Sequence, residues 1–188
     1  MIKAVKKALV CALTAALTFG TLASAAPTPT SPTQSVEPQR QTNVIAEQSN
    51  GISSTVDTKT DGTAKLAAVE ETSKKTITIS SKVTVNGVKY SVTEIDANAF
   101  ENCKNATKVS LPSTITKINA NAFTGAKKLK TIVLSGTKAI TVEKGAFKGI
   151  NTKKMTIKVS KKMSNKQFKK FKKNLRKAGY KGKLKRKK

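Results

Sequence analysis

The sequence predicts a mainly β fold with short helical turns, in which small repeats stack into a solenoid. Three observations lead to this prediction. A pattern ending in Ala-Phe recurs after 23 and then 24 residues, a β-type segment follows each copy, and an Asn-Gly pair joins two alternating runs before the first copy. A period in the low twenties with one aliphatic strand per repeat is typical of a solenoid.

The three copies of the pattern are Val92–Phe100, Ile115–Phe123 and, in looser form, Ile140–Phe147. One such repeat has too little core to be stable alone, so successive repeats must stack and share their apolar side chains. The inward columns that we expect are Ile95, Ile118 and Val142; Phe100, Phe123 and Phe147; Val109, Ile132 and Ile157; and Leu111, Leu134 and Val159. Ahead of the repeats, Asn86-Gly87 predicts an N-terminal β-hairpin, because both central residues of a type I′ turn need positive φ.

The composition excludes several kinds of catalytic and metal site. The 188 residues hold 37 Lys and Arg against 10 Asp and Glu, a formal net charge of +27, with no His and two Cys. Without His there is no Ser-His-Asp or Cys-His catalysis and no imidazole-ligated zinc. Glu94 and Asp96 resemble a carboxylate pair, but their counterparts in the second repeat are Lys117 and Asn119. We therefore expect no enzyme, no cofactor and no metal.

Residues 1–25 have the pattern of a secretory signal peptide. Three lysines precede an apolar run from Ala8 to Phe19, and Ala23-Ser24-Ala25 supplies the small residues of a cleavage site. The run is shorter than the roughly 20 apolar residues of a transmembrane helix. We expect cleavage after Ala25 and a secreted or cell-surface protein, with an uncleaved anchor as the alternative. Cleavage leaves Cys103 as the one thiol, which we expect to be buried rather than reactive.

Residues 26–73 are predicted to be a disordered linker rich in Thr, Ser and Pro. Four prolines lie in its first part and no aromatic residue occurs. Such a segment buries too little apolar surface to offset its chain entropy. The linker would be either a spacer that holds a domain away from the cell envelope or a simple N-terminal arm.

A helix is predicted over about 164–178, at the end of a repeat domain that spans 74–180. Ser164 and Gln167 have the spacing of a capping box, and the apolar residues that follow share one helix face. Those apolar residues are Phe168, Phe171, Leu175 and Ala178. We expect this helix to cap the open end of the solenoid, with a membrane-binding amphipathic helix as the alternative. Residues 181–188 are predicted to be a separate basic tail.

The repeats resemble those of the BspA-like leucine-rich repeat family of bacterial secreted and cell-surface proteins. The resemblance covers about residues 76–180 and rests on Ile-x-x-x-Ala-Phe followed by Leu-x-x-Ile-x-Leu, with Leu111-Pro112 at a strand end. Asp96 and Asn119 stand where the family often has Gly, and the third repeat has an extra residue. The resemblance implies a small leucine-rich-repeat solenoid that serves protein binding or adhesion and has no catalytic residues.

Two sets of residues are candidates for binding. The outward strand positions form a candidate binding face of Lys108, Ser110, Thr131, Val133, Thr156 and Lys158. The candidate polyanion-binding residues are Lys169, Lys170, Lys172, Lys173, Arg176, Lys177, Lys181, Lys183, Lys185, Arg186, Lys187 and Lys188. They belong to residues 151–188, which hold 18 basic residues and no acidic one.

The function predicted from these features is a secreted or cell-surface, non-enzymatic module for protein binding or adhesion, whose cationic C-terminus docks on anionic polymers or surfaces. The partner would be an extracellular protein or an anionic polymer of the envelope or of a host. The alternative is a cationic protein whose basic helix and tail bind polyanions, nucleic acid or the surface of a membrane. Lys outnumbers Arg 34 to 3 and aromatic residues are scarce, which argues against nucleic acid. The basic charge could also serve solubility alone.

Overall fold

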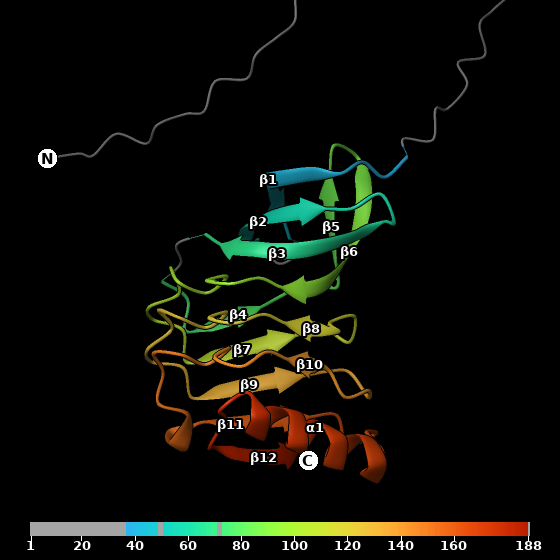
Figure 1. Cartoon of the computed structure of the whole chain (residues 1–188). Coiled ribbons are helices and arrows are strands. Elements are labelled where there is room, and N and C mark those ends of the chain that lie inside the picture. The colour runs from blue at the N-terminus through green and yellow to red at the C-terminus, as the bar shows by residue number, and fades with distance from the viewer. Residues whose placement is uncertain (1–36, 49–50, 71–72, 188) are drawn as a thin grey trace, which may run out of the picture. The chain divides into compact units, whose positions relative to one another are not determined.

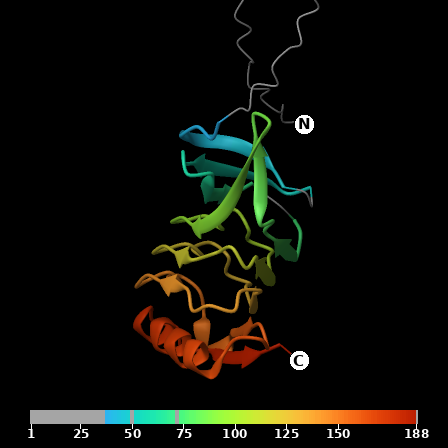
Figure 2. The same cartoon turned by 90° about the vertical axis from the view of Figure 1, so that its right-hand side faces the viewer.

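The computed structural model describes residues 37–187 except 49–50 and 71–72, all within one compact unit. Two β-sheets run along this unit (Figures 1 and 2). The first sheet consists, in spatial order, of β1 (Gln41–Glu47), β2 (Ser53–Thr58), β3 (Thr63–Val69), β6 (Val88–Ile95), β8 (Lys117–Ile118) and β10 (Thr141–Val142), and β5 (Lys82–Val85) pairs with β6. The second sheet consists of β12 (Lys183–Arg186), β11 (Thr156–Val159), β9 (Thr131–Leu134), β7 (Lys108–Leu111) and β4 (Thr76–Thr78). The helices are α1 (Asn165–Lys177) and the 3₁₀-helix η1 (Thr152–Lys154). The predicted signal peptide, 1–25, lies outside the described residues.

From β6 to β11 the chain alternates between the two sheets, so each repeat adds one parallel strand to each sheet. In the first sheet Ile95 pairs with Ile118, and Ile118 pairs with Val142. In the second sheet Val109 pairs with Ile132, and Ile132 pairs with Ile157. All of these side chains are buried between the sheets. The predicted solenoid and its inward aliphatic columns are confirmed.

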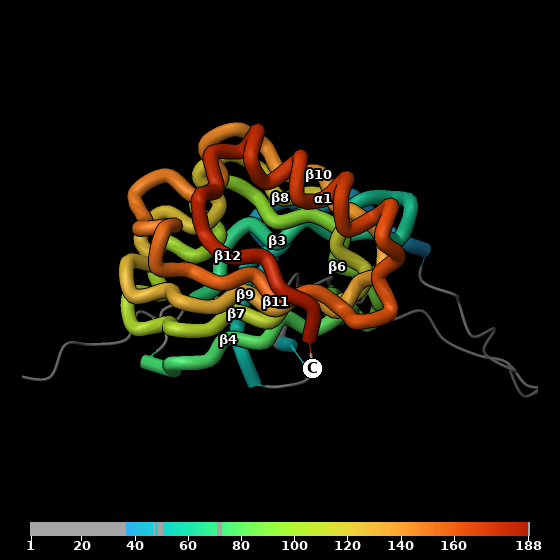
Figure 3. Tube along the Cα trace, turned by 90° about the horizontal axis from the view of Figure 1, so that it is seen from below, coloured from blue at the N-terminus to red at the C-terminus, as the bar shows by residue number. Residues whose placement is uncertain are grey.

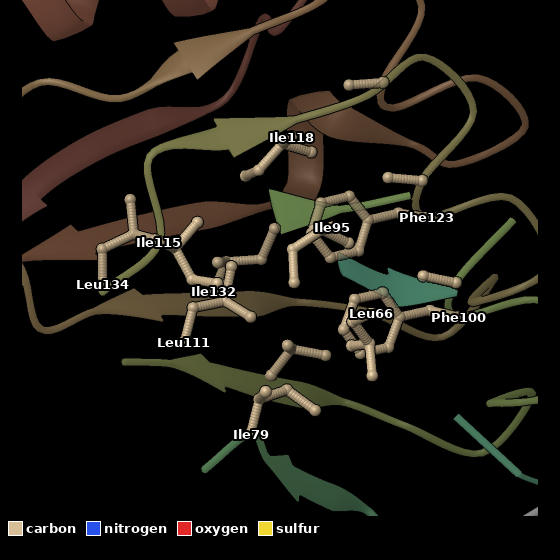
Figure 4. Close-up of a cluster of buried hydrophobic side chains, with 14 of the residues drawn as sticks. Leu66, Ile79, Ile95, Phe100, Leu111, Ile115, Ile118, Phe123, Ile132 and Leu134 are labelled. Atoms are coloured by element: carbon tan, nitrogen blue, oxygen red, sulfur yellow. The ribbon is translucent and has the colours of Figure 1, made fainter. Parts of the chain in front are cut away.

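The phenylalanines form the column of rings predicted from the repeats, of which Phe100 and Phe123 are seen in Figure 4. The ring centroids of Phe100 and Phe123 lie 5.0 Å apart, and those of Phe123 and Phe147 lie 5.6 Å apart, with nearly parallel planes. Backbone hydrogen bonds accompany the stack, since the Phe100 N–H donates to the Ala122 carbonyl and the Phe123 N–H donates to the Ala146 carbonyl. Each coil is therefore joined to the next by both ring contact and hydrogen bonds.

The N-terminal hairpin is also confirmed. Strands β5 and β6 pair antiparallel with Val85 opposite Val88, and the two residues between them have positive φ, 49° at Asn86 and 80° at Gly87. These are the backbone angles that a two-residue type I′ turn requires.

The predicted linker is wrong for residues 41–47, 53–58 and 63–69, which form β1, β2 and β3. Strands β1 to β3 pair antiparallel, and β3 then pairs parallel with β6, with Leu66 beside Ile95. Val56, Leu66 and Val69 are fully buried. These strands cover the N-terminal end of the solenoid, which would otherwise expose the apolar interior of its first coil.

The physical reason is that this segment folds around buried polar residues, which a search for apolar alternation does not find. Ser54 and Thr58 alternate with Val56 on the inward side of β2, and all three are buried. The Thr58 hydroxyl lies 2.6 Å from the Gln39 carbonyl, and the amide of buried Gln48 donates to the Ser54 hydroxyl over 3.1 Å. A polar group that is hydrogen-bonded can be buried at little cost, so Ser54 and Thr58 occupy inward positions beside Val56 that apolar residues would otherwise fill.

The C-terminal segment forms a further coil in which α1 takes the place of a strand of the first sheet. The Tyr180 ring continues the ring column 5.2 Å from Phe147, and the Gly145 N–H donates to the Ala178 carbonyl. Strand β12 then pairs parallel with β11, with Leu184 beside Ile157. The prediction of a domain that ends at residue 180, with a separate tail, is therefore wrong, because residues 183–186 are a strand of the second sheet.

Helix α1 caps the first sheet with polar side chains as well as apolar ones. Ser164 is the N-cap and its hydroxyl accepts from the Gln167 N–H over 3.3 Å, as predicted. The Gln167 side chain is directed elsewhere than in a capping box, because its Oε1 accepts from the Ala139 N–H over 2.9 Å. The Asn174 amide donates to the Ile140 carbonyl over 3.0 Å. Helix α1 thus bonds backbone groups just before β10, which is the last strand of the first sheet in the described chain.

Candidate binding face

The six predicted strand-face residues lie together on the outward side of the second sheet. Lys108 is in register with Thr131, and Ser110 is in register with Val133. On the other side of β9, Thr131 is in register with Thr156 and Val133 with Lys158. Side chains alternate along a strand, and the residues between these positions, Val109, Ile132 and Ile157, are buried on the inward side. The structure thus places the six residues on one surface.

Three lysines of the predicted tail extend this surface. Lys183 is in register with Thr156 and Lys185 with Lys158, while the Lys187 ammonium group lies 3.4 Å from the Ser135 hydroxyl. Lys108, Lys158, Lys183, Lys185 and Lys187 are named here the strand-face lysines. The tail and the strand face are therefore one surface and not the two separate sets predicted, and the alternation Lys-Leu-Lys-Arg after Gly182 is the local signal of this strand.

A shallow hollow of about 520 Å³ occupies this surface. Its lining consists of Lys108, Ser110, Thr131, Val133, Ser135, Lys158 and Lys187. Three ammonium groups therefore surround a floor of hydroxyl groups and one valine. Among the described residues, no acidic side chain forms an ion pair with any strand-face lysine. The hollow is thus a cationic surface with hydroxyl donors, and no described carboxylate neutralises its lysines by an ion pair. Ser135, which lies just beyond β9, is not among the residues predicted for this face.

The first sheet differs electrostatically from the second, because three lysines on it or beside it are paired with carboxylates. Lys59 lies 2.7 Å from Glu94, Lys117 lies 2.7 Å from Glu143, and Lys65 bridges Asp96 at 2.6 Å and Asp57 at 3.3 Å. Glu94 and Asp96, considered above as a carboxylate pair, are each engaged by a different lysine. Exposed pairs of this kind contribute little stability, but they leave this surface near neutrality.

The pKa values of two carboxyl groups on the first sheet reflect this pairing. The Lys117 ammonium group and the Ala120 N–H hold the pKa of Glu143 below its ordinary value. Burial raises the pKa of Asp96, but hydrogen bonds from Lys65 and Asn119 outweigh it and leave the pKa lowered. Both groups are therefore ionised at neutral pH, and neither is poised as a general acid.

The remaining predicted polyanion-binding residues divide into two groups. Lys169, Lys170, Lys172, Lys173 and Lys177 are exposed on α1, and Lys181 is exposed just after it. The two arginines, by contrast, hold the C-terminal coil together. The Arg176 guanidinium donates to the Tyr180 carbonyl, and that of Arg186 lies 4.7 Å above the Phe168 ring and donates to the Asn165 side chain over 2.8 Å. Lys188 lies outside the described residues.

Cys103 is fully buried, as predicted for a small apolar group, and burial raises the pKa of its thiol to about 11. In the part of the chain that the structure describes, no group of three or more Cys, Asp or Glu residues could hold a metal ion. Within the same ranges, no helix has both the length and the hydrophobicity to cross a membrane.

Comparisons with known proteins show which repeat family and which solved structures this chain resembles. The model of the BspA-type leucine-rich repeat region, in six copies, matches residues 93–185. None of the curated proteins compared with this chain matches it. A leucine-rich repeat protein from Bacteroides capillosus ATCC 29799 shares 23% identity and a TM-score of 0.53, over 76% of this chain and 99% of its own. The likeness to that structure shows the fold.

Two further solved structures are similar over shorter parts of their length. A leucine-rich cell surface protein from Faecalibacterium prausnitzii A2-165 shares 20% identity, with a TM-score of 0.47, over 64% of this chain. The pneumococcal vaccine antigen PcpA shares 21% identity, with a TM-score of 0.40, over 65% of this chain. This chain spans 38% of the former protein and 39% of the latter. The matched repeats and the stacked coils together show that residues 93–185 of this chain belong to the BspA-type leucine-rich repeat family of bacterial proteins.

Proposed function

We propose that this protein is an exported adhesion module that docks on anionic polymers through the outward face of its second sheet. The observation that carries the proposal is the set of five strand-face lysines, which have no acidic partner among the described residues. Three of them, Lys108, Lys158 and Lys187, line a hollow together with hydroxyl groups. Leucine-rich repeat proteins are generally binding modules rather than enzymes. Export is inferred from the signal-peptide pattern of residues 1–25.

The geometry favours a linear polymer over a single small anion. Neighbouring strands of a sheet lie about 4.8 Å apart, so the lysines form a flat array along the solenoid. Each ammonium group is a flexible point charge that imposes little geometry on an anion. A chain of phosphate or sulfate groups contacts several of these charges at once, while Ser110 and Thr131 offer hydroxyl donors between them.

The alternative, in which the basic helix is the active element at a membrane, is less well supported. An amphipathic helix binds a membrane by burying its apolar side in the lipid. Phe171 and Leu175 on α1 are instead buried in the protein, at 1% and 2% exposure. The helix therefore keeps most of its apolar side inside the protein, with Phe168 half-buried, and we regard its exposed lysines as a general contribution to the cationic field.

The test compares two variants that lose the same charge. One replaces Lys108, Lys158, Lys183 and Lys185 by Gln, and the other replaces Lys169, Lys170, Lys173 and Lys177 by Gln. Binding of the full chain and of each variant to heparin and to long-chain polyphosphate is measured by calorimetry at two salt concentrations, with neutral dextran as the control polymer.

We expect the strand-face variant to bind both polyanions at least about tenfold more weakly, since each lysine near an anionic surface contributes on the order of 1 kcal/mol. The helix variant should lose much less, because it retains the ordered array. Equal losses in the two variants would mean that net charge alone governs binding and would overturn the assignment of the face.

A further inference from the structure

We infer that the free edge of β12 is a strand-addition site for an extended, acidic segment of a partner protein. The site shares Lys183 and Lys185 with the face proposed above, but it uses the outward backbone groups of β12 and the groove beside them. Its ligand is a peptide in β conformation rather than a charged polymer.

The hydrogen bonds of β12 show which of its backbone groups point away from the sheet. The Lys183 N–H donates to the Met155 carbonyl, and the Lys187 N–H donates to the Val159 carbonyl. Since alternate residues of a strand point to the same side, the N–H and C=O groups of Leu184 and Arg186 point away from β11. Strand β12 is the last strand of the second sheet, and in the described chain no other strand pairs with this edge. Seen from the C-terminal end, α1 runs beside β12 and does not lie over it (Figure 3).

A groove of about 440 Å³ lies between β12 and α1. Its apolar lining comes from Phe168, Leu175, Tyr180 and Leu184, of which Phe168 and Leu184 are half-buried. Its cationic lining comes from Lys153, Lys172, Arg176, Lys181, Lys183 and Lys185. A peptide added to the edge of β12 would thus place alternate side chains against apolar and against cationic surface.

The charges select an acidic peptide over a second copy of this chain. The sequence after Glu143 contains no Asp or Glu. Pairing of two β12 edges would bring lysines to face lysines, which is how edge strands commonly avoid self-association. A strand with carboxylates in register with Lys183 and Lys185, and apolar residues in register with Leu184, satisfies both kinds of neighbour.

The experiment uses the full chain and a synthetic peptide of alternating Glu and Val, about eight residues long. Two control peptides have the same sequence but carry N-methylated amides, one at the odd-numbered and one at the even-numbered positions. Each therefore lacks the N–H donors of one edge of the peptide strand. A further control is an oligoglutamate of equal charge. Affinities are measured by fluorescence anisotropy, and the exchange of the Leu184 and Arg186 amide hydrogens is followed by NMR with and without peptide.

We expect the Glu-Val peptide to bind at least tenfold more tightly than the oligoglutamate, to slow exchange at Leu184 and Arg186, and to lose binding when N-methylated at one of the two sets of positions. Binding that is unchanged by either N-methylation, or unchanged exchange at those two amides, overturns the proposal and indicates attraction by charge alone.

A pair of protein variants provides an independent check. Leu184→Pro removes the outward N–H but keeps the donors of Lys183 and Lys187 to β11, a position at which an edge strand tolerates proline. Leu184→Val keeps the outward donor. The proline variant should lose peptide binding and retain heparin binding, while the valine variant should retain both. Retained peptide binding by a folded Leu184→Pro protein would also overturn the proposal. Heparin binding tests the strand face and peptide binding tests the edge of β12, so a failure of either proposal can be told from a failure of the other.

Discussion

Gly125 and Gly149 occupy the same position in successive repeats, two residues after a phenylalanine of the ring column, but they have different neighbours. Both have positive φ, 92° and 81°. A Cβ atom on Gly125 would lie 2.3 Å from the Glu101 carbonyl oxygen of the preceding coil, whereas one on Gly149 would meet no atom within 4 Å. Gly125 is thus needed both for its left-handed backbone and for the close stacking of the coils, whereas Gly149 is needed for its backbone conformation alone.

We therefore predict that Gly125→Ala destabilises the protein more than Gly149→Ala. The Gly149 substitution should cost about 1–2 kcal/mol in unfolding free energy, from the left-handed backbone alone. The Gly125 substitution should cost a further 1–3 kcal/mol or so, because the coils must separate. Urea unfolding followed by circular dichroism measures both values. Equal losses would contradict the close approach of the two coils.

Cys103 gives a prediction for alkaline pH. Burial raises the pKa of its thiol from an ordinary value of 9.0 to about 11, so the folded protein holds this proton more tightly than the unfolded chain. This contribution to stability is complete below about pH 9 and is lost as the pH rises towards 11. The free energy of unfolding of the parent protein should fall more steeply over this range than that of Cys103→Ala. Denaturant titrations at successive pH values test this, and parallel curves would contradict it.

At the scale of single residues, the sequence was most informative where chemistry repeats. Phe100, Phe123 and Phe147 could be assigned to one column because the same residue type returns at a constant spacing. Tyr180 continues that column but was not predicted to do so. It follows Phe147 after 33 residues, because the helix is inserted, and its hydroxyl lies 3.0 Å from the Met155 and Lys183 carbonyls. A change of spacing and of residue type together removes the periodic signal.

At the scale of elements, the two ends of the solenoid were predicted least well, and for different reasons. Strands β1 to β3 bury polar groups through specific hydrogen bonds, which depend on partners distant in sequence, as in the donation from the Ser80 N–H to the Gln48 side chain. Strand β12 is short and has only Leu184 as an apolar residue. Its conformation depends on β11 and on the Arg186 contacts with α1, which no local pattern contains.

Strand β12 also explains why only part of the candidate binding face could be predicted from the sequence. The strand face followed from the alternation in β7, β9 and β11, because inward and outward positions exchange at every residue. The contribution of Lys183, Lys185 and Lys187 to that face did not, because it requires the register of β12 on β11. Arg186, which was predicted to bind polyanions with these lysines, is on the same strand but contacts Met163 and Asn165 at the start of α1 instead.

For β12 we predict that strand formation and charge can be separated. Deletion of residues 181–188 should destabilise the protein strongly, because it uncovers β11 and removes the contacts of Arg186 with Met163, Asn165 and Phe168. Replacing Lys183, Lys185 and Lys187 by Gln should leave the free energy of unfolding within about 0.5 kcal/mol, since outward surface substitutions have small effects. Thermal and urea unfolding compare the two variants. A deletion as stable as the parent protein would contradict the assignment of β12 as a structural strand.

At the scale of the whole molecule, charge is distributed unevenly along the solenoid. The carboxylates that form ion pairs, on Asp57, Glu94, Asp96 and Glu143, all belong to the first sheet or adjoin it. Beyond Glu143 only basic charges follow. The C-terminal coil therefore folds against the repulsion of its own lysines and depends on the contacts of α1 and β12 to remain closed.

This repulsion predicts that salt stabilises the protein. Lysines at a spacing of four residues on α1, such as Lys169 with Lys173 and Lys173 with Lys177, destabilise a helix by a few tenths of a kcal/mol each. Raising NaCl from about 0.1 M to about 1 M shortens the screening length from about 10 Å to about 3 Å, so Tm should rise. The variant with Gln at 169, 170, 173 and 177 should start from a higher Tm in low salt and respond less. A Tm that falls with salt, as loss of the first-sheet ion pairs alone would cause, or an equal response of the two proteins, would show that repulsion in the C-terminal coil does not limit stability.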